Sequence, residues 1–330
     1  MEQRRVGRSG LLVSRLGLGT MTWGRDTDEH EAAEQLRDFL DAGGTLLDTA
    51  AGYGGGAAEE LLGELMAGMV SREEVVVCTR GGRRYDGRVD TSRRAMLSSL
   101  EESLQRLQIE AVDLWLAPAW NPAVPFEETL SALEHAVTSG RARYAGVSNF
   151  TGWQTALAAG AAASGPGGRS AAGPLVATSM EYSLVQRGVE REVLPAARAL
   201  GLGLLAWSPL GRGVLTGKYR TGTPADSRAA SPHLSGFVAP YLDGTSRRIV
   251  DAVVTAGDGL GCAPLEVALA WARDRAGVAS VLVGARTAAQ LRGSLASEEV
   301  ELPDEIRAAL DEVSAPPIGY PERPSPPLTV

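Results

Sequence analysis

The sequence contains little of what disulfide frameworks, metal sites and membrane spans require. Its 330 residues include only two cysteines, Cys78 and Cys262, and three histidines, His30, His135 and His233. The cysteines form no CxxC pair and the histidines stand far apart, so neither a disulfide framework nor a metal site is expected. No apolar run reaches the ~18 residues of a membrane span, and the first ten residues lack the apolar core of a signal peptide. We therefore expect a reduced, cytoplasmic protein with no membrane partner.

Positive charge is also scarce. The chain has 32 Lys and Arg residues against 40 Asp and Glu residues, a net charge of −8. Nucleic acids are bound through basic surfaces that displace counterions, so no nucleic-acid partner is expected and a small-molecule substrate is favoured. A chain of this length can bury about three quarters of its unfolded surface, and 44% of its residues are hydrophobic. No long polar linker divides it, which predicts one domain over residues 1–330. The oligomeric state is not readable from these features.

Short apolar segments recur along the chain and alternate with segments of helical character. Eight of them have the length and composition of strands: Leu16–Thr20, Thr45–Ala50, Val75–Arg80, Val112–Ala117, Tyr144–Asn149, Leu175–Tyr182, Gly203–Ser208 and Ser280–Ala285. Strands that alternate with helices form parallel sheets covered on both faces. Eight such units in this length fit a closed (β/α)8 barrel, the TIM-barrel architecture, better than an open sheet.

Three intervening segments carry apolar side chains at helical spacing. They are Asp28–Asp41, Thr91–Leu107 with Thr91 as its N-cap, and Pro125–Ser139, which Gly140 ends. The opening residues 4–15 predict a short β-hairpin that turns at Arg8-Ser9-Gly10 and closes the bottom of the barrel.

Three further segments have no strand or helix pattern over most of their length. Gly211–Asp243, after the seventh strand, is long and rich in Gly, Pro, Ser and Thr, and loops of that length are usually functional. Ala158–Pro174 is a low-complexity stretch in which we expect a helix end and a surface loop. Residues 316–330 form a Pro-rich tail that we expect to drape over the surface or to be disordered.

The carboxyl ends of barrel strands are where such proteins place their chemistry. Five motifs stand at or just beyond those ends: Asp48-Thr-Ala-x-x-Tyr53-Gly, Gly146-Val-Ser-Asn, Trp207-Ser-Pro-Leu-Gly-Arg-Gly, Gly217-Lys218-Tyr219 and Gly284-Ala-Arg. In this order and spacing they make the chain resemble the aldo-keto reductase superfamily, nearly end to end from Gly17 to Gln290. The resemblance implies a (β/α)8 barrel that binds extended NADP(H) without a Rossmann fold. It also implies reduction of carbonyl compounds by hydride transfer and proton donation.

The resemblance carries over only part of the family's catalytic tetrad. The aspartate falls on Asp48 and the tyrosine acid on Tyr53, but the lysine position is Arg80 and the histidine position is Pro118. Arg80 still supplies a positive charge beside Asp48, yet it cannot pass a proton, and Pro118 has no donor at all. Loss of one donor aimed at a developing oxyanion costs about 10²–10³ in rate. We expect catalytic roles for Asp48, Tyr53 and Arg80 and weak activity on ordinary carbonyls.

The resemblance also implies a cofactor site. The residues that it places there are Ser148, Asn149, Ser179, Trp207, Ser208, Leu210, Gly211, Gly213, Lys218, Arg228, Gly284, Arg286 and Gln290. Ser148 and Asn149 are expected at the nicotinamide carboxamide, Trp207 stacked on the ring, and Arg228 and Arg286 near the 2′-phosphate. Ser179 stands where the family has a longer glutamine, and Ser294 where it has an asparagine. Trp23, Pro118 and Trp120 are expected to wall the substrate mouth.

Simpler interpretations remain open for several of these residues. Asp48 and Arg80 could form an ion pair with a purely structural role, and Trp23 and Trp120 could be packing residues. Cys78 lies inside an apolar strand and is expected to be a core thiol. His233, in the long segment, is a candidate to face the site.

Two functions follow from these patterns. The first is an NADP(H)-dependent oxidoreductase with a remodelled site that reduces a carbonyl, imine or enone-like molecule, because such substrates need little help at oxygen. The alternative is a protein of the same type that transfers no hydride: a cyclase, dehydratase or isomerase, or a nucleotide-sensing binding protein.

Overall fold

A closed barrel of eight parallel strands forms the centre of the molecule. The computed structural model describes residues 1–82, 88–163, 175–225, 227–317 and 319. The barrel strands are β3 (Leu16–Gly19), β4 (Leu46–Asp48), β5 (Val76–Arg80), β6 (Val112–Ala117), β7 (Ala142–Ser148), β8 (Ala177–Glu181), β9 (Gly203–Trp207) and β10 (Val278–Val283). Each pairs with its neighbour in chain order and β10 closes onto β3. The predicted (β/α)8 barrel and its eight strand segments are confirmed.

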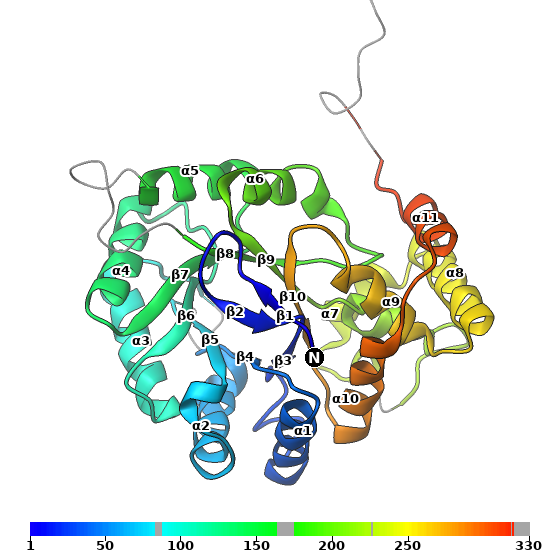
Figure 1. Cartoon of the computed structure of the whole chain (residues 1–330), viewed down its shortest axis with the longest axis horizontal. Helices are drawn as coiled ribbons and strands as arrows, with labels where there is room; N and C mark the ends of the chain where they lie inside the picture. The colour runs from blue at the N-terminus through cyan, green and yellow to red at the C-terminus, as the bar shows by residue number, and fades with distance from the viewer. Residues whose placement is uncertain (83–87, 164–174, 226, 318, 320–330) are drawn as a thin grey trace, which may run out of the picture.

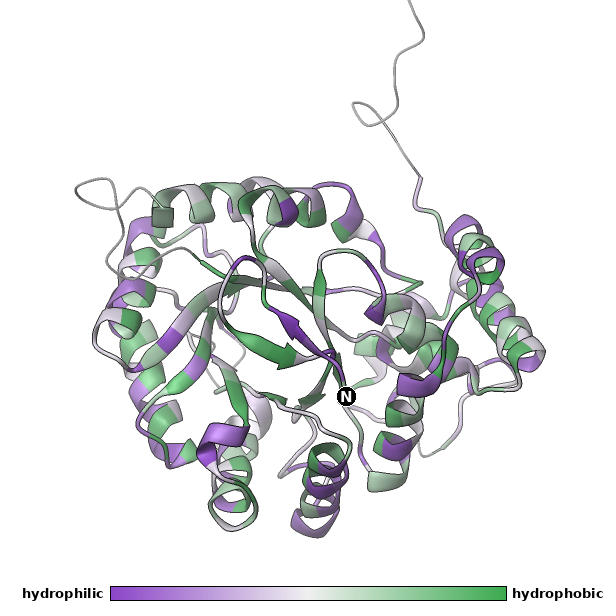
Figure 2. Ribbon diagram, in the orientation of Figure 1, coloured by the Kyte–Doolittle hydropathy of each residue, from purple (hydrophilic) through white to green (hydrophobic). Residues whose placement is uncertain are grey.

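Helices surround this barrel on all sides (Figure 1). They are α1 (Glu29–Asp41), α2 (Ala57–Met69), α3 (Arg93–Leu107), α4 (Phe126–Thr138), α5 (Gly152–Ala163), α6 (Val193–Leu200), α7 (Ser235–Val238), α8 (Gly244–Leu260), α9 (Pro264–Arg273), α10 (Ala288–Leu295) and α11 (Asp304–Val313). The barrel strands are largely hydrophobic and the helices carry polar outer faces (Figure 2). No single helix of the described segments is long and apolar enough to cross a membrane. Helices α8 and α9 together meet that test but are bent by 101° at their break.

Strand alternation divides the apolar side chains into two cores. On β4, Leu46 belongs to the cluster inside the barrel, while Leu47 belongs to the layer between strands and helices. Cys78 on β5 lies in the inner cluster and is fully buried, as expected of a core thiol. Because every second residue points inward, the last inward residues of the strands meet at the carboxyl end of the barrel.

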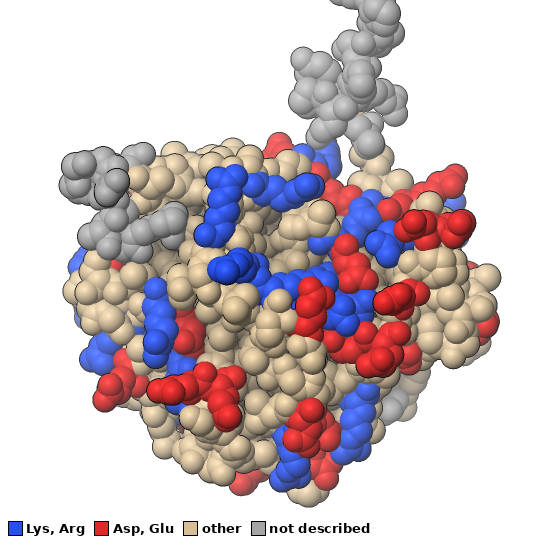
Figure 3. All heavy atoms as spheres, viewed as in Figure 1, with Lys and Arg blue, Asp and Glu red and all other residues tan. Residues whose placement is uncertain are grey.

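The N-terminal hairpin closes the other end of the barrel. Strands β1 (Gln3–Arg5) and β2 (Leu12–Ser14) pair antiparallel, and the Val6 amide donates to the Leu11 carbonyl at 2.9 Å. Gly7 has φ +59°, and a Cβ there would lie 2.1 Å from the Gly201 carbonyl oxygen, so glycine is needed where the turn passes under the barrel. The predicted hairpin is confirmed. Acidic and basic side chains are interspersed on this face (Figure 3).

The helix starts follow local hydrogen bonds. Asp28 caps α1, since its Oδ1 accepts from the Glu31 amide at 2.9 Å. The prediction of Thr91 as the cap of α3 is wrong: Ser92 is the cap, and its Oγ accepts from the Ala95 amide at 3.4 Å. The cause is Asp90, whose Oδ1 accepts from the Ser92 amide at 3.0 Å and moves the helix start one residue along.

The long segment after β9 is built from short turns. We call residues 211–243 the strap; it contains 3₁₀ turns at Gly211–Thr216, Arg228–Ala230 and Ala239–Tyr241 together with α7. The low-complexity stretch lies partly in α5, and its residues 164–174 are outside the described residues. The Pro-rich tail is also mostly outside them, at 318 and 320–330.

Candidate active site

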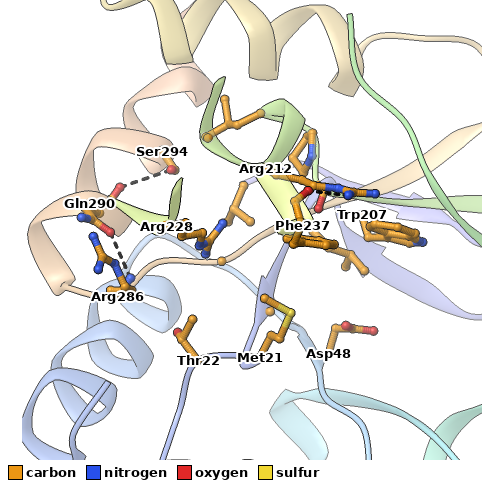
Figure 4. A pocket seen from close by; sticks show the side chains of 18 of the residues that line it. Met21, Thr22, Asp48, Trp207, Arg212, Arg228, Phe237, Arg286, Gln290 and Ser294 are labelled. Atoms are coloured by element: carbon orange, nitrogen blue, oxygen red, sulfur yellow. Dashed lines mark hydrogen bonds between the residues drawn. The ribbon is translucent and has the colours of Figure 1, made fainter. Parts of the chain in front are cut away.

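A cavity of about 670 Å³ opens at the carboxyl ends of the barrel strands (Figure 4). Most predicted site residues line it: Asp48, Tyr53, Arg80, Pro118, Asn149, Trp207, Ser208, Leu210, Gly213, Lys218, Arg228, Gly284, Arg286 and Gln290. At one end are the residues that follow β4, β5 and β6. At the other end are the basic side chains of the strap and of the segment after β10.

A buried ion pair forms the floor of the first end. The Arg80 Nη2 donates to Asp48 Oδ1, and only 11% and 4% of the two side chains are exposed. Burial raises the pKa of Asp48, and the charge of Arg80 only partly offsets it. Burial lowers the pKa of Arg80, but the interactions with Asp48, Tyr53 and Cys78 together outweigh it, so the pKa of the guanidinium is raised. Arg80 is therefore a fixed cation at this position.

Tyr53 and Pro118 stand above this pair. Tyr53 begins a 3₁₀ turn, Tyr53–Gly56, directly after β4, and its ring is half-buried on the cavity wall. Pro118 follows β6 and presents its ring to the cavity, while its carbonyl accepts from Asn149 Nδ2 at 3.0 Å. Tyr53 and Arg80 line this end of the cavity together with Pro118.

Asn149 and Trp207 form a wall beside the ion pair. Asn149 adopts φ +58°, which turns its side chain onto the cavity. Ser148 and Ser179 do not line the cavity: both are fully buried, and Ser148 Oγ donates to the Ser179 carbonyl at 3.1 Å. The Ser179 hydroxyl is buried, and no described residue forms a hydrogen bond with it. The structure therefore places Asn149 and Trp207 on the cavity surface, and the two serines behind it.

The other end of the cavity is basic. Lys218, Arg228, Arg286 and Gln290 line it, and the Arg286 amide donates to Gln290 Oε1 at 3.0 Å. Burial and the nearby charge of Arg286 lower the pKa of Arg228, and Tyr219 and Asp26 only partly offset this. No hydrogen bond or ion pair joins the Arg228 guanidinium to any side chain in the described part of the chain. Two guanidinium groups held together in this way are suited to an anion.

Two predicted substrate residues lie elsewhere. The prediction that Trp23 walls the mouth is wrong, because its side chain is fully buried and its indole N–H donates to Gln35 Oε1 at 3.1 Å. Trp120 does not line the cavity either, since it stacks on Phe126 at 5.0 Å between ring centroids and contacts Trp153 at 5.2 Å. Both tryptophans therefore have the packing role that the sequence left open.

Gly211 and His233 also lie off the cavity. Gly211 is buried behind its neighbours Leu210 and Arg212, which do line the cavity. His233 is exposed, and its Nε2 lies 3.3 Å from Asp26 Oδ1.

Sequence reasoning missed several lining residues. Met21 and Thr22 enter from the loop after β3, and Arg212 and Phe237 from the strap. Met21 follows a strand end directly, so the rule that strand ends form the site was a usable signal for it. Phe237 lies in a segment without periodicity, and nothing in the sequence marked it.

The cavity suits a long ligand that carries phosphate groups. Its basic end presents Arg228 without a carboxylate partner among the described residues, and its opposite end presents the flat indole of Trp207. Between them Gly213 lines the cavity with φ +97°, where glycine lets the backbone face a ligand without a side chain. The residues present therefore fit a dinucleotide. In the described ranges, no group of three or more His, Cys, Asp or Glu side chains is placed to hold a metal ion.

Comparison with known proteins gives consistent matches over almost the whole chain. The family model described as "Aldo/keto reductase family" matches residues 15–315. The chain is 36% identical over 331 residues to "Uncharacterized oxidoreductase YrpG" of Bacillus subtilis, covering 97% of this chain and 98% of that protein. It is 34% identical to a "Probable voltage-gated potassium channel subunit beta" of Oryza sativa subsp. japonica, covering 94% and 97%. A protein of the same description from Arabidopsis thaliana is 32% identical, covering 98% and 99%.

Proposed function

The chain belongs to the aldo/keto reductase family of oxidoreductases, and from this premise we propose that it uses NADP(H) to reduce a carbonyl, imine or enone-like small molecule in a remodelled active site. The observation that carries the choice of cofactor is the half-buried Arg228 guanidinium. It lines the cavity beside Arg286 without a carboxylate partner among the described residues. A 2′-phosphate would place a negative charge beside these two guanidinium groups.

In this proposal, residues at different places along the cavity have different roles in binding and catalysis. Lys218, Arg228 and Arg286 bind phosphate groups, and the indole of Trp207 supports the nicotinamide ring. When bound, NADPH supplies the hydride for the reduction. Tyr53 gives its phenol proton to the substrate heteroatom, and the fixed charge of Arg80 stabilises the phenolate that remains. Asp48 holds Arg80 in place.

The substrate class follows from what surrounds Tyr53. Pro118 contributes an apolar ring where a donor would help to polarise a ketone or aldehyde. Imines, iminium ions, enones and quinones need less of that help, because their own charge or conjugation polarises the reacting bond. Met21 and Phe237 also line the cavity, which favours a mid-sized, partly apolar molecule.

A second candidate is a nucleotide-binding protein, or an enzyme of non-redox type, that transfers no hydride. Two observations favour it. Arg80 is committed to a buried pair with Asp48, and two relatives are described as probable voltage-gated potassium channel subunits. In this case the cavity would bind a dinucleotide without turnover.

Nicotinamide fluorescence separates these functions. We expect NADPH to bind about tenfold or more tightly than NADH, because a 2′-phosphate gains charge-assisted bonds. Arg228→Ala should remove that preference. Arg220→Ala is the matched control, since Arg220 is a strap arginine that pairs with Asp251 at 2.8 Å, 44% exposed and outside the cavity.

Single-turnover oxidation completes the experiment. Addition of a quinone or an enone to the NADPH complex should oxidise it slowly. Tight binding with no oxidation by any of the four substrate classes would favour the second candidate. No binding of either dinucleotide would overturn the cofactor proposal.

A further inference from the structure

Arg212 has a backbone conformation that residues other than glycine rarely adopt. Its φ is +59°, and it stands between Gly211 and Gly213, whose φ values are +54° and +97°. Glycine tolerates this region because it has no Cβ, whereas arginine is disfavoured there. Such strain persists where surrounding interactions hold it, and it gathers at ligand-binding sites. The contacts of the Arg212 side chain should therefore show what holds this backbone conformation.

The Arg212 guanidinium joins three separate parts of the fold. Its Nε donates to Glu181 Oε1 at 2.8 Å and its Nη2 to Glu181 Oε2 at 2.6 Å, a bidentate pair with the last residue of β8. Its Nη1 donates to the Phe237 carbonyl in α7 at 2.5 Å. The guanidinium carbon lies 3.9 Å from the centroid of the Phe237 ring and 5.0 Å from that of Tyr241. Figure 4 shows Arg212 beside Trp207 and Phe237 on the cavity wall.

We propose that Arg212 is a positioning residue that fixes the strap to the barrel and so holds the dinucleotide-binding loop, residues 208–218, in its binding conformation before the ligand arrives. The identity of the ligand rests on the function proposed above, but the fixing itself rests only on contacts within the chain. Ser208, Leu210, Gly213 and Lys218 lie in this loop and line the cavity. If only a fraction of molecules holds the loop correctly, the apparent affinity falls by that fraction.

Charge balance argues against Arg212 as the direct receptor of a substrate or cofactor anion. Glu181 neutralises it at two hydrogen-bond distances, and only 15% and 13% of the two side chains are exposed. Lys218, Arg228 and Arg286 line the other end of the cavity. Arg212 therefore acts on binding through the loop.

Arg212→Gly is the decisive variant, because it removes the guanidinium and also suits the left-handed backbone. Glu181→Gln keeps the shape of the Glu181 side chain but removes its charge. Arg212→Lys keeps the positive charge but loses the bidentate hydrogen bonds to Glu181. Arg220→Ala serves as control, since it removes an exposed arginine of the same strap that lies outside the cavity.

Two measurements test the proposal, one without any cofactor. Amide hydrogen exchange on the ligand-free protein should be faster over residues 208–218 in Arg212→Gly and Glu181→Gln than in the parent, and unchanged in Arg220→Ala. The dissociation constant for NADPH should rise about tenfold or more in the first two, rise less in Arg212→Lys, and stay constant in the control.

The outcomes of the two proposals are distinguishable. If the parent binds NADPH and Arg212→Gly binds it equally well with unchanged exchange, the role given to Arg212 is overturned. If the parent binds no dinucleotide, the proposed function fails, and the exchange measurement alone decides whether Arg212 fixes the loop.

Discussion

A guanidinium on the floor of the cavity differs in two respects from the amine that the family resemblance places there. It cannot release a proton at any working pH, and its planar fork is held by the Asp48 carboxylate. In the function proposed above, the proton for the substrate therefore comes from Tyr53. The proline on the opposite wall adds no donor to help it.

Restoring the two replaced groups should restore ordinary carbonyl chemistry. We expect the double variant Arg80→Lys with Pro118→His to raise kcat/KM for a simple aldehyde by about 10²-fold, because one oxyanion donor is worth that much. The measurement is consumption of NADPH by its absorbance. The dissociation constant for NADPH serves as control and should not change. An aldehyde rate equal to that of the parent would show that the missing donors do not limit the reaction.

Single residues also show where sequence reasoning stops. Asp48, Tyr53 and Arg80 could be placed on the cavity because they follow strand ends, and strand ends converge in a barrel. Trp23 also follows a strand end, but the loop turns its indole inward to Gln35, a partner twelve positions away. Ser148 and Ser179 point behind the wall for a similar reason, since the hydroxyl of Ser148 bonds to the carbonyl of Ser179. Such side-chain directions depend on tertiary hydrogen bonds that no local pattern records.

At the scale of elements, periodic segments were predictable and the strap was not. Helices α1, α3 and α4 were predicted from apolar spacing. Their predicted first residues differ from the observed ones by at most two positions. The strap has no period because its shape comes from contacts with other elements, such as those between Arg212 and Glu181. A loop of this kind takes its conformation from the surface it covers.

The carboxylate of Asp311 in helix α11 binds two residues in and just after α9. Asp311 Oδ1 accepts from the Trp271 indole N–H at 2.9 Å, and Arg275 Nη1 donates to Oδ2 at 2.8 Å. Trp271 is 1% exposed, so loss of this acceptor leaves a buried donor without a partner.

We expect Asp311→Ala to lower the free energy of unfolding by about 1–3 kcal/mol, the cost of an unsatisfied buried donor. It should also speed hydrogen exchange in α11. Urea denaturation measures the first effect. Asp311→Asn, which keeps an oxygen for Trp271, should lose less, and Glu312→Ala, exposed on the same helix, should lose little. Equal stability of Asp311→Ala and the parent would mean that the other contacts of α11 hold it without this carboxylate.

At the scale of the whole molecule, ion pairs join the N-terminal hairpin to the end of α9. Asp274, after α9, accepts from Arg273 Nε at 2.8 Å and from Arg4 of the hairpin at 3.4 Å. Burial raises the pKa of Asp274, but the hydrogen bonds and charges of Arg273 and Arg4 together outweigh it, so the pKa lies below its usual value.

This lowered pKa predicts a loss of stability in acid. An acid with a depressed folded pKa stabilises the fold above its unfolded pKa of about 4, and the contribution is lost as the pH falls through the folded value. We expect Asp274→Asn to be less stable than the parent at pH 7, with the difference shrinking as the pH falls below ~4. Urea denaturation curves across this range measure it. Parallel stability curves for the two proteins would contradict the assignment.

The hairpin under the barrel has a practical consequence. Strands β1 and β2 close the end of the barrel opposite the cavity, and the N-terminus lies beside them in Figure 1. A tether attached to Met1 therefore points away from the cavity entrance. The molecule can therefore be immobilised on a bead or electrode through its first residue with its mouth facing the solution.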